Sequence, residues 1–161
     1  MENESVPSSS HQQDDSINPE VLAELERCAA CNLRATARAV TNYFDKAFSS
    51  IGLRVTQTSI LAGIARLQPT TVGELAAALQ IDHSTLVRNL KRLKELNLFT
   101  SGKGEDRRTR TLSLTEKGEK KVLETIPLWR EAQGKIERDV GGDWDKHLEF
   151  LRELRESVTH L

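Results

Sequence analysis

Apolar residues recur at helical spacing along most of the chain, and this pattern predicts a mainly α-helical protein. Asn18 can cap a helix and Pro19 suits its first turn, after which the spacing continues without proline or glycine until Gly52. It predicts one helix of about 30 residues, well above the usual 10–14. A helix that long extends past the core of a small protein, so we expect it to pack against another subunit. A second helix is predicted after Thr56 and ends before Pro69.

Two short helices separated by a tight turn are predicted in the middle of the chain. Residues 71–74, Thr-Val-Gly-Glu, form a capping-box pattern that opens the first helix. Asp82 or His83 can cap the second. Its predicted buried stripe consists of Leu86, Val87, Leu90, Leu93 and Leu96. Only a few residues around Gln80 separate the two helices, which is the spacing of a helix-turn-helix.

The next segment alternates apolar and polar residues and predicts a β-hairpin. Residues 109–115 place Leu112 and Leu114 on one face, and residues 98–101 can supply the partner strand. The leucines can be buried while the arginine-rich end of the hairpin projects.

Two amphipathic helices are predicted after the hairpin. Thr115 can cap the first, which runs from about Glu116 to Val140, and Pro127 predicts a kink within it. Asp143 can cap the last helix. The expected fold class is therefore mainly α with a small β-hairpin.

The net charge of −1 conceals a basic segment. Residues 81–110 contain eight basic and four acidic side chains, a balance of +4, so the remainder of the 161-residue chain carries −5. The basic residues are Arg88, Lys91, Arg92, Lys94, Lys103, Arg107, Arg108 and Arg110. A basic segment inside an otherwise acidic protein is typical of phosphate binding.

The polar face of the second short helix carries residue types that contact DNA. Ser, Thr, Asn and Arg side chains read base edges in the major groove, and Lys and Arg hold phosphates. The candidate contacts are His83, Ser84, Thr85, Arg88, Asn89, Lys91 and Arg92. An ordinary amphipathic helix with a solvated basic face explains the same residues if this helix is considered alone.

The hairpin beside the helix-turn-helix favours DNA binding, because together they form a winged helix. Arg107 and Arg108 at the hairpin tip can reach the minor groove, where the enhanced negative potential suits arginine. Phosphates would repel Asp106, so we expect it to orient Arg108 instead.

The run from Asp106 to Gly118, DRRTRTLSLTEKG, resembles the Asp-x-Arg…Leu-Thr-x-x-Gly wing signature of the MarR family of bacterial regulators. Residues 82–90, DHSTLVRNL, resemble the start of that family's recognition helix. The order of elements is also similar, over about residues 19–158. Gln80 departs from the family pattern, which often has glycine there, and a left-handed non-glycine residue costs roughly 1 kcal/mol.

The resemblance implies a winged helix-turn-helix at about residues 54–115, with dimerisation helices at about 19–50 and 116–159. It implies a homodimer that binds a pseudo-palindromic operator in double-stranded DNA, usually as a repressor released by a small organic ligand or by an oxidant. Residues 1–17 are polar and lack periodicity, which predicts a disordered arm before a single domain at 18–161. The alternative is a helical winged-helix adaptor that binds protein instead of DNA.

Cys28 and Cys31 lie one turn apart in the predicted first helix and are candidate effector or redox residues. They could form a disulfide, pair across a dimer, or present a thiolate stabilised by Arg27 or Arg34. Two small hydrophobic residues in a helix interface explain the same pair. A zinc site needs about four ligands, and the histidines lack the required spacing, so no metal is expected.

Other classes of protein are disfavoured by the sequence. It contains no P-loop, nucleophile elbow, zinc-protease or dinucleotide motif, so we expect neither an enzyme nor a cofactor. No apolar run approaches the roughly 18 residues of a membrane span. The acidic, Ser/Gln-rich start does not resemble a secretory signal, and a cytoplasmic location is expected.

Overall fold

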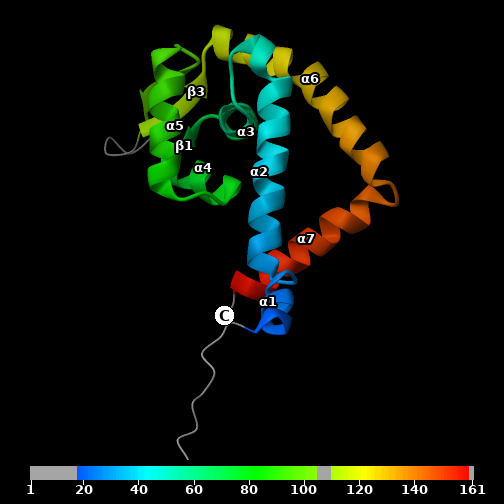
Figure 1. Ribbon diagram of the computed structural model, residues 1–161. Coiled ribbons are helices and arrows are strands. Elements are labelled where there is room, and N and C mark those ends of the chain that lie inside the picture. Colours follow the sequence, from blue (N-terminus) through cyan, green and yellow to red (C-terminus); the bar gives the residue numbers. More distant parts are fainter. Residues whose placement is uncertain (1–17, 105–109, 160–161) are drawn as a thin grey trace, which may run out of the picture. The chain divides into compact units, whose positions relative to one another are not determined.

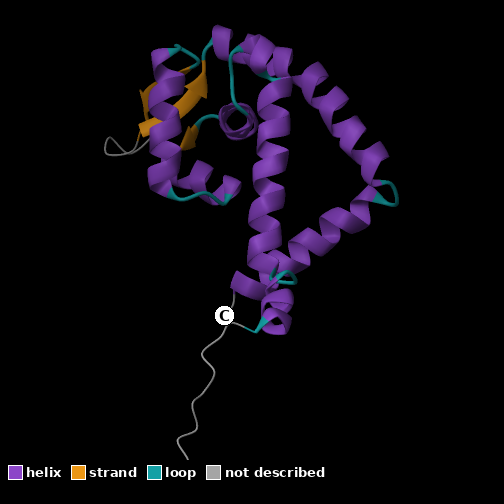
Figure 2. Ribbon diagram, in the orientation of Figure 1, coloured by secondary structure: helices purple, strands orange, loops and turns teal. Residues whose placement is uncertain are grey.

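The computed structural model describes residues 18–104 and 110–159 and shows a mainly helical fold with a small antiparallel sheet, as predicted (Figures 1 and 2). The elements in chain order are α1 (Pro19–Leu25), α2 (Ala29–Ala47), the 3-10 helix η1 (Ser49–Ile51), α3 (Val55–Leu67), β1 (Thr70–Thr71), α4 (Val72–Leu79), α5 (His83–Glu95), β2 (Phe99–Lys103), β3 (Arg110–Leu114), α6 (Glu116–Val140) and α7 (Trp144–Thr159). The chain divides into two compact units, residues 1–38 and 39–161, with the boundary inside α2. The predicted arm, residues 1–17, lies outside the described residues.

The single long helix predicted from Pro19 is wrong, because the chain leaves the helix between α1 and α2. The backbone N–H groups of residues 26–28 donate to carbonyls three residues earlier, which tightens the chain into a turn. The Asn32 side-chain amide donates to the carbonyls of Glu26, at 2.7 Å, and Cys28, at 3.0 Å. The Asn32 side chain thus satisfies carbonyl groups at the break, and the spacing of apolar residues cannot predict such a polar contact.

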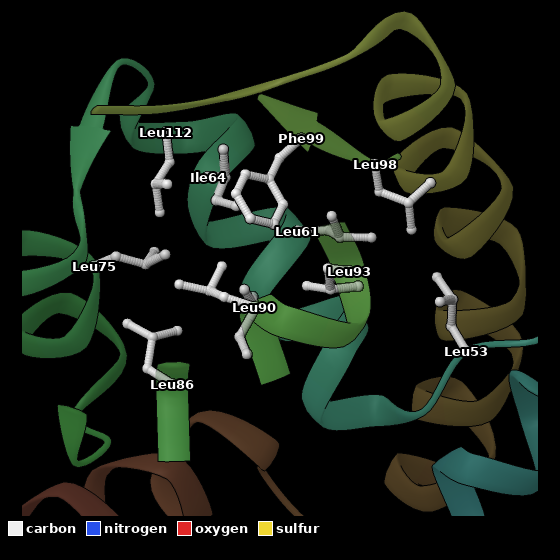
Figure 3. Packing of buried hydrophobic residues seen from close by; sticks show 11 residues of the cluster. Leu53, Leu61, Ile64, Leu75, Leu86, Leu90, Leu93, Leu98, Phe99 and Leu112 are labelled. Atoms are coloured by element: carbon white, nitrogen blue, oxygen red, sulfur yellow. The ribbon is translucent and has the colours of Figure 1, made fainter. Parts of the chain in front are cut away.

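The main core of the second unit is formed by α3, α4 and α5 together with the sheet. Its buried members are Leu53, Ile60, Leu61, Ile64, Leu75, Leu86, Leu90, Leu93, Leu98, Phe99 and Leu112. Figure 3 shows the side chains of Leu61, Ile64 and Phe99 directed toward those of Leu90 and Leu93. The sheet and the second helix of the helix-turn-helix therefore share one core.

The sheet has three strands in the order β1-β3-β2, all antiparallel. Phe99 pairs with Leu114 and Ser101 pairs with Leu112, which confirms the predicted hairpin. The two-residue strand β1 was not predicted, because two threonines are too short a run to show alternation. Thr70 of β1 pairs with Leu112.

The helix starts follow the predicted caps. Thr71 Oγ1 accepts from the Glu74 N–H at 3.1 Å, while Glu74 Oε2 accepts from the Thr71 N–H at 2.7 Å, completing the capping box. Thr115 Oγ1 accepts from the Gly118 N–H at 3.0 Å at the start of α6. Asp143 Oδ1 accepts from the Asp145 N–H at 3.1 Å at the start of α7.

A smaller cluster within the second unit joins the end of α2 to α6. Phe44 and Phe48 are buried against Ala132, and the Tyr43 hydroxyl donates to the Ala132 carbonyl at 3.3 Å. By contrast, α7 has no buried residue, and Phe150 is 60% exposed. Among the described helices, none combines the length and apolar character needed to cross a membrane.

We expect Gly118→Ala to destabilise the fold by about 1–3 kcal/mol, the usual cost of overpacking. A Cβ at this position would overlap the Leu98 carbonyl oxygen, which belongs to the backbone and cannot move aside easily. Gly73→Ala is the matched control, because the nearest atom to its new Cβ, Thr71 Oγ1, is 4.0 Å away. This second change should leave stability equal or raise it by up to about 1 kcal/mol. Urea denaturation measures both, and unchanged stability in Gly118→Ala would contradict the close approach.

Candidate nucleic-acid interface

A three-residue turn joins α4 to α5 and forms the predicted helix-turn-helix. Gln80 adopts the left-handed conformation, with φ 53° and ψ 43°. The Ile81 N–H donates to the Ala76 carbonyl at 3.2 Å, which closes the end of α4. The turn is therefore built with the geometry expected of a glycine, although the chain carries glutamine there.

Of the two predicted caps, Asp82 and not His83 precedes α5 and organises its first turn. Its Oδ1 accepts from the Ser84 hydroxyl at 2.6 Å and from the Thr85 N–H at 2.8 Å. Hydrogen bonds from the Ser84 and Thr85 side chains and from the Thr85 N–H hold the pKa of Asp82 well below its ordinary value. The carboxylate is thus charged at neutral pH, and it accepts the one hydrogen bond that the Ser84 hydroxyl can donate.

The candidate DNA contacts on α5 differ in exposure. Leu86, Leu90 and Leu93 are buried, which directs the opposite face of the helix outward. The exposed candidates are His83, Ser84, Arg88, Lys91 and Arg92, whereas Thr85 and Asn89 are half-buried.

Two side chains on α5 differ from the prediction, one in its hydrogen bonding and one in its burial. The Asn89 amide donates to the Thr85 carbonyl at 2.9 Å, so this donor is already used within the helix. Val87 was predicted in the buried stripe and is instead 46% exposed. The prediction failed because Val87 lies only one position, about 100°, from buried Leu86, and the core reaches only Leu86.

The hairpin extends two positive charges toward the wing tip. Lys103 of β2 and Arg110 of β3 are direct cross-strand partners, and both are exposed. Like charges at such positions are destabilising without an anion nearby. These two residues were not among the predicted DNA contacts, although both belong to the basic segment at residues 81–110. The predicted tip residues Asp106, Arg107 and Arg108 lie outside the described residues.

Cys28 directly precedes the first residue of α2, where the backbone N–H groups of the first turn have no carbonyl partner within the helix. The Cys31 N–H, the Cys31 thiol and the Ala30 N–H donate to Cys28 Sγ and lower the pKa of the Cys28 thiol. The pKa of Cys31 is raised, chiefly by its hydrogen bond with Cys28, and Arg34 opposes this only weakly. The main cause is the helix start, not the arginines considered from the sequence.

The two thiols are free, with Cys31 exposed and Cys28 half-buried. The expectation that both lie within one continuous helix is wrong, because Cys28 precedes the first residue of α2. The pair therefore consists of one thiol at a helix entrance and one in the first turn.

Comparison with known proteins identifies the family. A family model described as MarR family matches residues 51–108. The M. tuberculosis transcriptional regulator MosR, solved in complex with DNA, is 32% identical over 83% of this chain and 97% of that chain, with a TM-score of 0.76. The chain belongs to the MarR family.

Two further proteins are similar to this chain. The uncharacterized HTH-type transcriptional regulator YwoH of Bacillus subtilis (strain 168) is 29% identical over 92 residues, covering 57% of this chain and 67% of YwoH. A MarR/EmrR family transcriptional regulator from Acinetobacter sp. ADP1 shares 20% identity over 85% of this chain and 99% of its own, and its TM-score of 0.76 supports the fold. The predicted family and its class, transcriptional regulators, are confirmed.

The MarR-family model covers the helix-turn-helix and β2 and ends inside the wing. Cys28 and Cys31 lie outside the residues that this model matches, so it assigns no role to the pair. Within the described parts of the chain, no cluster of three or more His, Cys, Asp or Glu side chains could hold a metal ion.

The second unit of this MarR-family chain also contains a cavity of about 480 Å³. Its lining consists of Tyr43, Lys46, Ala47, Leu128, Glu131, Ala132, Lys135 and Arg138. This lining combines apolar side chains with three cations, which outnumber the single carboxylate. Lys135 also pairs with Asp139 at 2.6 Å, which raises the pKa of the Lys135 ammonium.

We expect Asp82→Ala to lower the stability of the fold, because the first N–H groups of α5 lose their acceptor. Asp82→Asn is the control that retains an acceptor and removes the charge, so it should be affected less. The folded-state pKa is depressed, so the carboxylate stabilises the fold above its unfolded pKa of about 3.9 and this contribution declines as the pH falls below it. Urea denaturation at pH 7 and pH 3 should therefore show a smaller difference between wild type and Asp82→Asn at pH 3. An unchanged difference would contradict the role of the charge.

Proposed function

We propose that this MarR-family regulator binds a pseudo-palindromic operator in double-stranded DNA as a homodimer and represses transcription until its cysteines are oxidised. The observation that carries the DNA-binding part is the outward face of α5, which is exposed, basic and held by a buried leucine stripe. MosR, at 32% identity, was solved in complex with DNA. A regulator acting on chromosomal DNA would work in the cytoplasm.

The residues of α5 divide by chemistry into base readers and phosphate contacts. Arg88 is exposed on the outward face and has the planar fork that reads guanine, so we assign it to the bases. Lys91, one turn later, suits phosphate as a point charge. The Ser84 hydroxyl donates its hydrogen bond to Asp82, so the hydroxyl oxygen is left to accept a hydrogen bond from a base amino group.

The remaining candidates on α5 supply positioning contacts. Arg92 is exposed, and its ion pair with Glu95 at 3.2 Å is solvent-accessible, so the pair is weak and does not prevent contact with a phosphate. His83 stands exposed at the first helical position. Thr85 and Asn89 are half-buried, and we assign them a secondary role at the edge of the interface.

The wing supplies the second DNA contact in this proposal. Lys103 and Arg110 place paired cations at the described end of the hairpin, which an anionic partner would stabilise. We assign Arg107 and Arg108 to the adjacent minor groove and Asp106 to orienting Arg108, on the basis of their sequence positions.

The homodimer follows from apolar surface that the described chain leaves open. α7 buries none of its residues, and its apolar positions Phe150, Leu151 and Val158 are all exposed. Trp129 and Leu123 of α6 are also exposed, at 48% and 65%. We propose residues 19–50 and 116–159 as the dimerisation region and residues 54–115 as the DNA-binding region, preceded by the arm at 1–17.

We expect Arg88→Ala to weaken operator binding by about 1–3 kcal/mol and to relax preference at one base pair in each half-site. Lys91→Ala should weaken operator and random DNA similarly and reduce the salt dependence. Electrophoretic mobility shifts with both duplexes at several salt concentrations separate the two effects. Equal losses of both variants on both duplexes would contradict the assignment of Arg88. No shift with any duplex would favour the protein-binding alternative.

Oxidation is the releasing signal that the cysteine geometry favours. The Cys28 thiolate is stabilised by the N–H groups at the entrance of α2, which makes it the better nucleophile. It can attack a peroxide oxygen, giving a sulfenic acid and releasing an alcohol or water. The Cys31 thiol then attacks the Cys28 sulfur and expels water, so that two thiols and one peroxide yield a disulfide. A small organic effector in the 480 Å³ cavity is the second candidate, since its lining offers apolar side chains and several cations.

We expect a stoichiometric peroxide to form the Cys28–Cys31 disulfide and to weaken operator binding at least tenfold, because closing it distorts the first turn of α2. Reductant should restore binding. Cys28→Ser should abolish the response, and Cys31→Ser should stop at the sulfenic acid. Mass spectrometry and mobility shifts follow the two events together. Full operator affinity in a protein whose disulfide has formed would overturn this release mechanism.

A further inference from the structure

Val87 is an exposed apolar residue on the helix assigned to the major groove. It is 46% exposed, whereas its neighbour Leu86 is fully buried. Isolated exposed valines are common on protein surfaces and need no explanation by themselves. The position of this one, among the residues assigned to DNA, is what gives it significance.

The outward strip of α5 consists of Ser84, Val87, Arg88 and Lys91. These residues have the i, i+3, i+4, i+7 spacing of one helix face, and all four are exposed. Val87 is therefore a neighbour of Arg88 in the chain and of Ser84 and Lys91 on the surface. A duplex that contacts those three side chains would also cover Val87.

We propose that Val87 is a specificity-determining residue that packs against the C5-methyl group of a thymine in each half-site. This inference rests on the proposed DNA-binding function. A valine side chain has no hydrogen-bond donor or acceptor, so it cannot read the polar base edges. The thymine methyl is the apolar feature that a base pair presents in the major groove.

Two properties of Val87 suit this contact. Its β-branched side chain has one strongly preferred rotamer in a helix, so little freedom is lost when a methyl group packs against it. The charges beside it also favour DNA over a second protein copy. Arg88 and Lys91 are attracted to the negatively charged duplex, whereas the same two cations on another copy would repel them.

The test begins with a duplex selected by the wild-type protein from a random-sequence pool. Each thymine of a half-site is then replaced by deoxyuridine, which lacks only the C5-methyl group. We expect one position at which the replacement weakens wild-type binding about fourfold, the factor for removing one buried methyl group from contact. The same replacement should leave the affinity of Val87→Ala unchanged.

Val87→Ala keeps the helix, because the position is exposed and alanine favours helix more than valine does. Thermal unfolding by circular dichroism confirms that the variant is folded. Val87→Thr is the size-matched variant, and its discrimination between thymine and uracil should be intermediate, because one of the two methyl groups is replaced by a hydroxyl.

Three results would overturn the inference. They are a selected half-site without a fixed thymine, wild-type affinity unaffected by deoxyuridine at every position, or the same thymine-to-uracil ratio in wild type and Val87→Ala. Specific binding that survives in any of these cases leaves the proposed DNA-binding function intact. Failure to select any duplex would overturn both proposals.

Discussion

The burial of one leucine stripe on α5 is the constraint on which the candidate interface depends. Leu86, Leu90 and Leu93 enter the same core as Phe99 and Leu112 of the sheet. Because protein cores are densely packed and tolerate little movement, this shared core fixes the helix and the base of the wing together. The polar face of α5 is outward for the same reason, since the three leucines determine the rotation of the helix about its axis.

Short polar side chains complete what the apolar stripe begins. The stripe sets which face of α5 is buried, but it does not set where the helix starts. Asp82 does this by accepting a hydrogen bond from the Thr85 N–H, and it also accepts one from the Ser84 hydroxyl. A cap that serves structure thus also decides which hydrogen-bonding role remains for a neighbouring side chain at the DNA-facing surface.

The chemistry of the cysteine pair likewise depends on a helix boundary. If α1 and α2 were one continuous helix, the N–H groups of Ala30 and Cys31 would donate to backbone carbonyls of the preceding turn and not to the Cys28 sulfur. The break at residues 26–28 frees these groups, and they lower the pKa of the Cys28 thiol. Asn32 contributes to the same break through its contacts with the carbonyls of Glu26 and Cys28. The break between α1 and α2 therefore gives the thiols of Cys28 and Cys31 different pKa values.

The sequence by itself determined the helix-turn-helix, the hairpin, the caps at Thr71 and Thr115, and the basic character of residues 81–110, and it left Asp82 and His83 as alternative caps of α5. These features arise from local spacing and short-range hydrogen bonds, which the linear order of residues carries directly. Only the tertiary structure decided that Val87 is outside the core, that Thr70 pairs with Leu112, and that α1 and α2 are separate helices. Burial at the edge of an apolar stripe depends on how far a packed neighbour reaches, and pairing of a two-residue strand depends on a partner about forty residues away. The hydrogen bonds of the Asn32 amide at the break depend on where a folded turn places its acceptors, and periodicity reports none of these distances.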